Sequence, residues 1–341
     1  MKLRLFSCAI ALLAFASCRN VTSPGTPPTS SGSWTSVNSG SPESLIVGQF
    51  VNATAGFVTG QHGTVLVTND AGKTWSTGSP APCYSGSLDG NLYGISFFDA
   101  QNGIVAGDQR DISKTTDGGY TWQPMDASYV PQSDLIRSMY FTNRNTGFIG
   151  TSDVYAGPSG SICQTTDGGQ TWYPVFTTHG GIYNMDFNIP GSNGMHGVAT
   201  GRYGVDYWTT DGGTTWHPGS SDQPNSLIYS TTFTSATTGF AVAVAPITGT
   251  ATTGYILSTL DGGHTWATIK TIASGLFHIA TNGAGTVTAV GQNGTVIEST
   301  DGGTTWTPTT VGPGNWNDII YVNPHHAVLF GANGAIDVRD N

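Results

Sequence analysis

The octapeptide T-T-D-G-G-T-T-W (Thr209–Trp216) is one of six related copies along a chain of 341 residues. The other copies are T-N-D-A-G-K-T-W (Thr68–Trp75), T-T-D-G-G-Y-T-W (Thr115–Trp122), T-T-D-G-G-Q-T-W (Thr165–Trp172), T-L-D-G-G-H-T-W (Thr259–Trp266) and S-T-D-G-G-T-T-W (Ser299–Trp306). Their aspartates are separated by 47, 50, 44, 50 and 40 residues. A repeat of this length is typical of the four-stranded blades of a β-propeller.

Two further marks divide each repeat into strands. A glycine stands seven residues before the aspartate in five copies, whereas Arg110 holds that place in the second copy; the glycines are Gly63, Gly160, Gly204, Gly254 and Gly294. We expect these positions to form tight turns with positive φ. Upstream, a Phe-x5-Gly pattern follows alternating apolar residues that predict an inner strand, as at Tyr93, Ile95 and Phe97. Each repeat is thus expected to form strands A, B, C and D, with the octapeptide between C and D.

The two ends of the repeat array complement each other. The last segment, Gly331–Asn341, matches the sixth repeat but stops where the next aspartate would stand. The segment Ser31–Val37 contains Trp34 and resembles a lone outer strand. Pairing of these segments would complete a seventh blade and remove an open sheet edge. The sequence therefore predicts an all-β, seven-bladed propeller over residues 33–341, closed by its N-terminal strand.

Composition supports this architecture and excludes several classes of protein. Only 9% of residues are charged, 48 are glycine, and the formal net charge is −10. Few helix-favouring Lys and Glu residues argue against a helical protein, and 11% aromatic residues argue against disorder. Because nucleic acid binding needs a basic face, we expect no nucleic acid partner.

The N-terminus has the features of a secretory signal. Residues 1–17 contain Lys2 and Arg4, then a short apolar stretch that leads to Phe15-Ala16-Ser17-Cys18. Small residues before a cysteine resemble a bacterial lipobox, which implies a lipoprotein signal peptide, lipidation of Cys18 and membrane attachment through the lipid. Ordinary signal cleavage is the alternative. Residues 18–32 are predicted to be a Pro/Ser/Thr tether. Arg19, in place of Asp after the cysteine, resembles lipoproteins of two-membrane bacteria, which implies a cell-envelope location at the outer membrane.

The octapeptide resembles the BNR/Asp-box repeat. Its aspartate can accept hydrogen bonds from its own turn, and its tryptophan can pack between blades. Because six turns around a ring cannot converge on one site, we assign them a structural role. This set comprises Asp70, Asp117, Asp167, Asp211, Asp261 and Asp301 with Trp75, Trp122, Trp172, Trp216, Trp266 and Trp306.

The fuller pattern, with glycines ahead of T-x-D-G-G-x-T-W, resembles the photosystem II stability and assembly factor family. This resemblance implies a seven-bladed propeller that binds a partner protein chain during assembly of a membrane complex. No catalytic or metal-binding motif stands beside this pattern, so we expect no cofactor and no metal ion.

Long loops and scattered cations suggest a candidate binding face. The long segments 77–91, 125–134, 153–161 and 243–253 belong to B–C or D–A connections, which share one face of a propeller. That face is predicted to carry His62, Arg110, Arg137, Arg202 and Tyr203. The alternative is a set of solvated charges neutralised by Asp108, Asp111 and Asp153. Cys83 and Cys163 are a possible disulfide, which the sequence alone leaves open.

Two functions remain open. We expect a non-catalytic, monomeric envelope protein that binds an unidentified protein, since no zinc-binding spacing of histidines and no nucleophile elbow is present. The alternative is a carbohydrate-binding or glycan-cleaving propeller, in which exposed Tyr84, Tyr129, Tyr155 and Tyr203 would stack on sugars. Cleavage would need two carboxylates close together in a groove.

Overall fold

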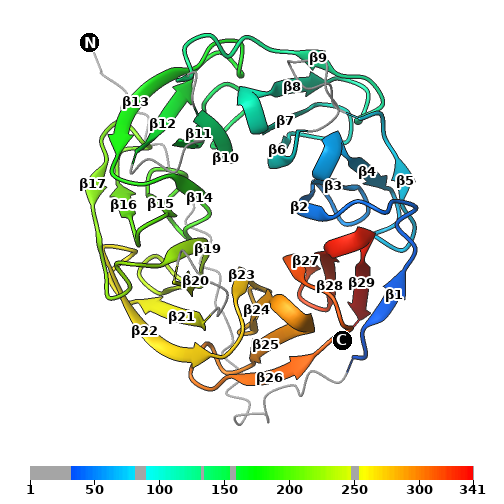
Figure 1. The fold of residues 1–341 in the computed structure, drawn as a ribbon, viewed down its shortest axis with the longest axis vertical. Helices are drawn as coiled ribbons and strands as arrows, with labels where there is room; N and C mark the ends of the chain where they lie inside the picture. Colours follow the sequence, from blue (N-terminus) through cyan, green and yellow to red (C-terminus); the bar gives the residue numbers. More distant parts are fainter. Residues whose placement is uncertain (1–31, 81–89, 132–133, 154–158, 247–252, 341) are drawn as a thin grey trace, which may run out of the picture.

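The computed structural model describes residues 32–80, 90–131, 134–153, 159–246 and 253–340. Seven antiparallel sheets stand around a central channel, one for each predicted blade (Figure 1). The prediction of an all-β, seven-bladed propeller is confirmed.

The blades follow the chain in order. Blade 1 comprises β2 (Leu45–Phe50), β3 (Gly56–Gly60), β4 (Val65–Thr68) and β5 (Ser76–Thr77). Blade 2 comprises β6 (Leu92–Phe97), β7 (Gly103–Gly107), β8 (Ile112–Thr115) and β9 (Gln123–Pro124). Blade 3 comprises β10 (Asp134–Phe141), β11 (Gly147–Asp153), β12 (Gly160–Thr165) and β13 (Tyr173–Thr178). Blade 4 comprises β14 (Ile182–Asp186), β15 (Gly197–Gly201), β16 (Asp206–Thr209) and β17 (His217–Pro218).

Two of the remaining blades, 5 and 7, depart slightly from this plan. Blade 5 comprises β19 (Leu227–Phe233), β20 (Gly239–Ala245), β21 (Thr253–Thr259) and β22 (Thr265–Ile272), with the short parallel strand β18 (Ser220–Ser221) on its outer edge. Blade 6 comprises β23 (Leu276–Thr281), β24 (Val287–Gly291), β25 (Thr295–Ser299) and β26 (Thr307–Thr310). Blade 7 comprises β27 (Trp316–Asn323), β28 (His326–Gly331), β29 (Ile336–Asp340) and β1 (Thr35–Val37).

The N-terminal strand closes the ring, as predicted. Strand β1 pairs antiparallel with β29, with Thr35 opposite Val338 and Val37 opposite Ile336. The ring of Trp34 lies 4.7 Å from Cζ of Arg339 and packs between blades 6 and 7. Trp34 thus takes, in blade 7, the place that the octapeptide tryptophan takes in the other blades.

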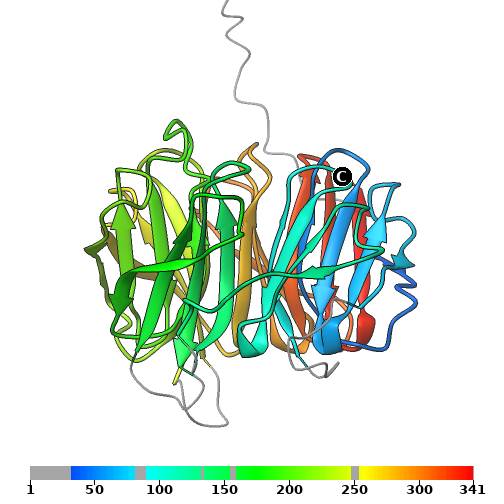
Figure 2. The ribbon, with the colours of Figure 1, turned by 90° about the horizontal axis from the view of Figure 1, so that it is seen from above.

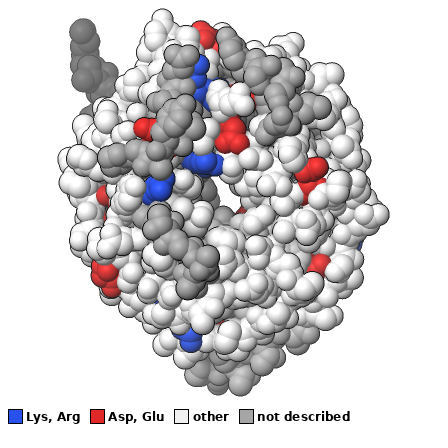
Figure 3. Space-filling model, viewed as in Figure 1, with Lys and Arg blue, Asp and Glu red and all other residues white. Residues whose placement is uncertain are grey.

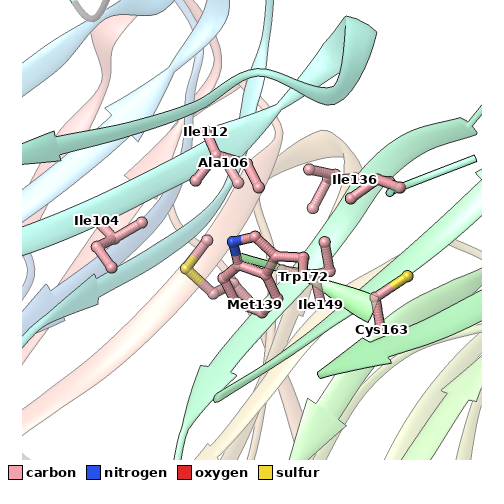
Figure 4. Packing of buried hydrophobic residues seen from close by; sticks show 9 residues of the cluster. Ile104, Ala106, Ile112, Ile136, Met139, Ile149, Cys163 and Trp172 are labelled. Atoms are coloured by element: carbon pink, nitrogen blue, oxygen red, sulfur yellow. The ribbon is translucent and has the colours of Figure 1, made fainter. Parts of the chain in front are cut away.

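The hydrophobic core is divided into seven clusters, one between each pair of neighbouring blades. Figure 4 shows the cluster between blades 2 and 3, where fully buried Trp172 contacts Ile104 and Met139. Trp172 also meets Phe141 edge to face at 5.7 Å. Burial of side chains of this size contributes about 1.5–3 kcal/mol each, so these clusters stabilise the ring at every seam.

The Phe-x5-Gly pattern has a steric cause. A Cβ atom placed on Gly103 would lie 2.5 Å from the ring of Phe97, and the same clash would occur at Gly147 against Phe141. The glycine on strand B therefore lets the phenylalanine of strand A lie flat against the neighbouring backbone.

The B–C turns agree with the sequence prediction in part. Gly63, Gly204 and Gly294 have φ of 68°, 64° and 70°, as expected, and Arg110 takes the same conformation with φ of 63°. The prediction is wrong for two glycines, Gly160 and Gly254, which lie within strands β12 and β21. Their blades have long B–C connections in place of a tight turn.

The propeller has two distinct faces. We call the side with the octapeptide turns and the A–B connections the Asp-box face, and the side with the B–C and D–A connections the mouth face. Figure 2 shows the molecule from the side, with the short 3-10 turns of the mouth face along the lower edge and the C-terminus near the upper edge.

The segment predicted to carry a lipid anchor lies outside the described residues. The predicted signal peptide 1–17, Cys18 and the tether before Gly32 belong to this part, so their assignments stay predictions. Within the described residues, no helix is both long and apolar enough to cross a bilayer.

Candidate functional site: a ring of bulged residues in the central channel

Every inner strand carries a β-bulge at the same place. The strand pairing skips one residue in each blade, and these seven residues are Ile46, Tyr93, Arg137, Tyr183, Tyr229, Phe277 and Asn317. We call this set the channel ring. A bulge adds one unpaired residue and turns its side chain out of the regular alternation.

The bulge separates two neighbouring side chains. The residue before it is buried between blades, as Ile136, Ile182 and Ile228 show, all with no exposed area. The bulged residue instead lines the channel, where all seven members border one cavity of about 790 Å³. The seven bulges therefore place one side chain from each blade around a common opening.

Arg137 lies between aromatic neighbours in the ring. Its Cζ is 4.3 Å from the ring centre of Tyr93 and 5.6 Å from that of Tyr183. Asp108 is its nearest carboxylate, with an Nη1–Oδ1 distance of 3.9 Å, too long for a strong hydrogen bond. The Nε atom is buried and donates no hydrogen bond within the described structure. The accessible part of the Arg137 guanidinium, whose only ion pair among the described residues is this 3.9 Å contact, is therefore what a ligand could reach.

The aromatic members form a continuous arc. Tyr183 meets Tyr229 edge to face at 6.0 Å, and Tyr229 meets Phe277 at 5.5 Å. Burial, together with neighbouring Tyr183, raises the pKa of Tyr229 to about 12, although Arg137 and Arg202 act in the opposite sense. Its hydroxyl is therefore neutral at physiological pH and can donate a hydrogen bond. Tyr93, Arg137, Tyr183, Tyr229 and Phe277 come from five consecutive blades.

Two buried carboxylates lie behind this arc. Asp318 Oδ1 is 2.9 Å from His278 Nδ1, and Asp318 Oδ2 accepts a hydrogen bond from the backbone of Gly48 at 2.8 Å. Burial opposes the charged imidazole, but Asp318, and after it Asp186, raise the pKa of His278 above its usual value. Burial raises the pKa of Asp186 to about 6, against the hydrogen bond from Asn188.

No Asp or Glu lines the channel cavity in the part of the chain that the structure describes. Neither Asp186 nor Asp318 borders it, although both lie on inner strands. The arrangement that glycoside cleavage requires, two carboxylates flanking a bound sugar, is therefore not found among the described residues of this cavity.

The five predicted binding residues lie on the mouth face or in the channel but do not form one cluster. Figure 3 looks onto this face, where the basic side chains in view lie mainly on one side of the channel. Arg137 lies in the channel ring, whereas Arg202 forms an isolated β-bridge with Leu227. Arg110 instead donates hydrogen bonds to the carbonyls of Val130 and Ala127, at 3.0 and 3.4 Å.

The other two predicted residues lie in turns. Nδ1 of His62 is 2.6 Å from Glu43 Oε2, in blade 1. Tyr203 is 36% exposed, has φ of 63° and lies 5.2 Å from Cζ of Arg202. A bulky residue at positive φ is uncommon and costs free energy, which makes this turn of blade 4 a candidate for a functional contact. The binding role of the five residues stays a prediction.

The aromatic arc was missed in the sequence, although a signal was present. Each member of the channel ring stands four positions before the residue that occupies the Phe position of the Phe-x5-Gly pattern. Tyr93 stands in this way before Phe97, and Tyr183 before Phe187. An alignment of the seven inner strands on that position would have shown that Tyr229 and Phe277 are equivalent to Arg137.

The carboxylate of each Asp-box turn accepts hydrogen bonds from residues of the same turn. In blade 4, Thr209 Oγ1 and the backbone of Thr215 donate to Asp211 Oδ1 at 2.8 and 2.9 Å, and Thr215 Oγ1 donates to Oδ2 at 2.6 Å. The hydrogen bonds from Thr215 and Thr209 lower the pKa of Asp211 to about 2. Among the described residues, no group of three or more His, Cys, Asp or Glu side chains could hold a metal ion.

One cysteine of the predicted pair lies among the described residues. Cys163 is buried in the cluster between blades 2 and 3, beside Trp172. Cys83 lies outside the described residues. Pairing of the two cysteines stays a prediction.

Comparison with known families supports the predicted resemblance. Residues 83–176 match the family described as Photosynthesis system II assembly factor YCF48, and residues 207–218 match the BNR/Asp-box repeat. A search of curated protein sequences finds no significant match.

Solved structures share the fold at low sequence identity. A structure of YCF48 bound to a D1 peptide is 20% identical with a TM-score of 0.67, covering 93% of this chain and 97% of its own. YCF48 from Cyanidioschyzon merolae is 19% identical with a TM-score of 0.68, covering 90% and 98%. The GH74 xyloglucanase from Xanthomonas campestris is 12% identical with a TM-score of 0.69, covering 91% of this chain but 54% of the enzyme. The chain is therefore a seven-bladed propeller of BNR/Asp-box repeats that resembles the YCF48 assembly factors.

Proposed function

We propose that this protein is a lipid-anchored propeller of the cell envelope that binds a segment of a partner protein in its central channel. In this role it acts as a non-catalytic scaffold for binding or assembly. The observation that carries the proposal is the channel ring, where Arg137 lies between Tyr93 and Tyr183 and is paired with Asp108 only at 3.9 Å.

The chemistry of the ring suits a protein ligand. Tyrosine and arginine are the residue types that contribute most to protein interfaces, because they combine large contact area with directed hydrogen bonds. Asn184, Asn188 and Asn317 add amide groups around the same cavity, and each uses part of its amide within the protein, on Thr231, Tyr140 and Leu45. The remaining donors and acceptors of these amides can pair with an extended backbone. A segment with a carboxylate would satisfy Arg137, since guanidinium–carboxylate pairs are strong when partly desolvated. The YCF48 structure with a D1 peptide supports a peptide ligand by analogy.

Glycan binding is the second candidate, because tyrosines also stack on sugar rings and a GH74 enzyme shares the fold. The lack of Asp or Glu around the cavity, in the part of the chain that the structure describes, favours binding over cleavage for such a ligand. Binding to a glycan array without capture of a protein would support this candidate over the first.

The test is affinity capture from detergent-solubilised membranes with matched arginine variants. Arg137→Met keeps the apolar stem but removes the charge, whereas Arg144→Met removes an exposed arginine that is paired with Asp99 at 2.8 Å on the Asp-box face. We expect the wild type and Arg144→Met to recover the same protein, and Arg137→Met to lose it. Equal recovery by all three proteins would contradict the proposal.

The anchor requires a separate test. In cells fed an alkyne fatty acid, the wild type should become labelled and a Cys18→Ser variant should not. An unlabelled wild-type protein would contradict lipidation, and fractionation of the envelope would test the outer-membrane location. The results of these two experiments do not depend on whether the channel ring binds a partner.

A further inference from the structure

The N-terminal part of the chain enters the propeller from one of its two faces. Strand β29 follows a B–C turn, Ala332–Gly334, and so runs from the mouth face to the Asp-box face. Because β1 is antiparallel to β29, the chain enters β1 from the Asp-box side, past Trp34 and Arg339. Fourteen residues separate Cys18 from Ser33, a distance of at most about 50 Å when fully extended.

The Asp-box face carries the most exposed apolar side chain described. Leu260, in the octapeptide turn of blade 5, is 78% exposed, and Met195, in the A–B connection of blade 4, is 51% exposed. His196 joins the two segments, since it lies directly against Gly262 of the blade 5 turn. The Met195 carbonyl accepts a hydrogen bond from Gly212 at 2.8 Å, which fixes this connection on the turns of the same face.

An aromatic cluster supports this apolar pair. The ring of Trp208 stacks on His264 at 3.9 Å and lies 4.5 Å from His217. The cluster joins the outer part of blade 4 to the turn of blade 5. Met195 and Leu260 therefore project from packed turns, which lowers the entropy lost when they contact a surface.

From these features we infer that the Asp-box face rests on the lipid surface, with Met195 and Leu260 inserted at the interface, so that the mouth face points away from the bilayer. This inference depends on the proposed lipid anchor, because two exposed side chains alone bind lipid weakly. The anchor makes their contact intramolecular and raises its effective concentration. The Asp-box carboxylates stay charged, as the low pKa of Asp211 and Asp301 indicates. The surface that fits is therefore zwitterionic, not anionic.

The contact can be measured with a fluorophore at defined positions. In the full lipidated protein with Cys83→Ser, Leu260→Cys would carry an environment-sensitive dye on the Asp-box face. Asn293→Cys would carry the same dye in a B–C turn of the mouth face, as a matched control. The protein is placed in phosphatidylcholine vesicles that contain a nitroxide-labelled lipid.

We expect several times more quenching at position 260 than at position 293, and a loss of that difference when Met195→Asp is added. Exchange of half the phosphatidylcholine for phosphatidylglycerol should also reduce the difference in quenching between the two positions. Equal quenching at both positions, or stronger quenching at 293, would overturn the inference while leaving the anchor intact. Failure of the protein to associate with the vesicles at all would instead contradict the proposed anchor, together with the orientation that depends on it.

Discussion

The Asp-box turns occur in six blades and the channel ring in all seven, and the two sets differ in how far their sequence varies from blade to blade. Six turns repeat nearly the same octapeptide and make the same hydrogen bonds, as in Thr68–Asp70 and Thr209–Asp211. The ring repeats the same β-bulge but fills it with Ile, Tyr, Arg, Tyr, Tyr, Phe and Asn. Constancy at equivalent positions indicates a role in folding, whereas divergence inside a constant backbone indicates a surface shaped for a ligand.

The seventh blade shows what replaces the octapeptide where it is missing. Arg339 of β29 donates to Glu298 of blade 6 at 2.6 Å, and both side chains are buried. Glu298 also accepts a hydrogen bond from Thr288, whose hydroxyl lies 2.6 Å from that of Tyr321. With Trp34 over Arg339, this network links blades 6 and 7 at the closure of the ring.

The largest effect is expected at this closure. Glu298→Ala would leave Arg339 buried without its partner, which typically costs 3–5 kcal/mol, so we expect about that loss in the free energy of unfolding. Urea denaturation monitored by tryptophan fluorescence would measure it. The double variant Glu298→Leu/Arg339→Met should recover most of the loss, and a loss below about 1 kcal/mol for Glu298→Ala would indicate that the network is not needed.

The second prediction concerns the carboxylate behind the arc. The pKa of Asp186 is raised to about 6, so the folded protein loses stability as the pH rises from about 4 to 6 and the group must ionise. Asp186→Asn should therefore stabilise the protein at pH 7.5 by about 2–3 kcal/mol and leave it unchanged below pH 4. Thermal unfolding at both pH values tests this; a variant that is less stable at pH 7.5 would show that the charged form is preferred.

The third prediction breaks one of the repeated turns. Asp211→Ala removes three hydrogen bonds, and we expect a cost of about 1–2 kcal/mol with no change in partner binding. Because the folded pKa of Asp211 is lowered to about 2, this contribution is present above pH 4 and is lost as the pH falls towards 2. The wild type and variant should therefore become equally stable near pH 2. A constant difference over the whole range would contradict this assignment.

The smallest effect is expected at a turn where the repeat departs from its pattern. Tyr203 has φ of 63°, a conformation that Asn293 and Asn333 adopt in the corresponding turns of blades 6 and 7. Tyr203→Asn should stabilise the protein by roughly 0.5 kcal/mol, since asparagine tolerates this region better. If Tyr203 contacts the ligand, the same variant should bind the partner less well. Unchanged binding would remove Tyr203 from the candidate face.

The fold could be predicted because its determinants are local and repeated. The octapeptide marks the blades. The segment around Trp34 has the pattern of the outer strand that the last repeat lacks, so the closure of the ring could be predicted from this sequence alone. The tight turns at Gly160 and Gly254 were predicted wrongly because the length of each B–C connection differs between blades. Strand β18 was not foreseen, since its parallel pairing with β22 depends on how two blades meet.

The site was harder to predict because a bulge is a property of two paired strands. The alternation of residues along β14 gives no reason to single out Tyr183. Its side chain faces the channel because the pairing of β14 with β15 skips this residue. Arg137 was identified from its charge, whereas the uncharged tyrosines around it could have been found only by aligning the seven inner strands. The cation–π contacts of Arg137 then follow from the geometry of the ring.

One measurement tests the role of the channel ring most directly. Phe277, the last member of the arc, would be replaced in cells by the photoreactive residue benzoylphenylalanine, with Tyr120 of the Asp-box face as the control position. After irradiation we predict one discrete protein adduct from position 277 that disappears when Arg137→Met is added, and none from position 120. A protein adduct from position 120 alone, or one from 277 that survives Arg137→Met, would contradict binding of a partner segment in the ring.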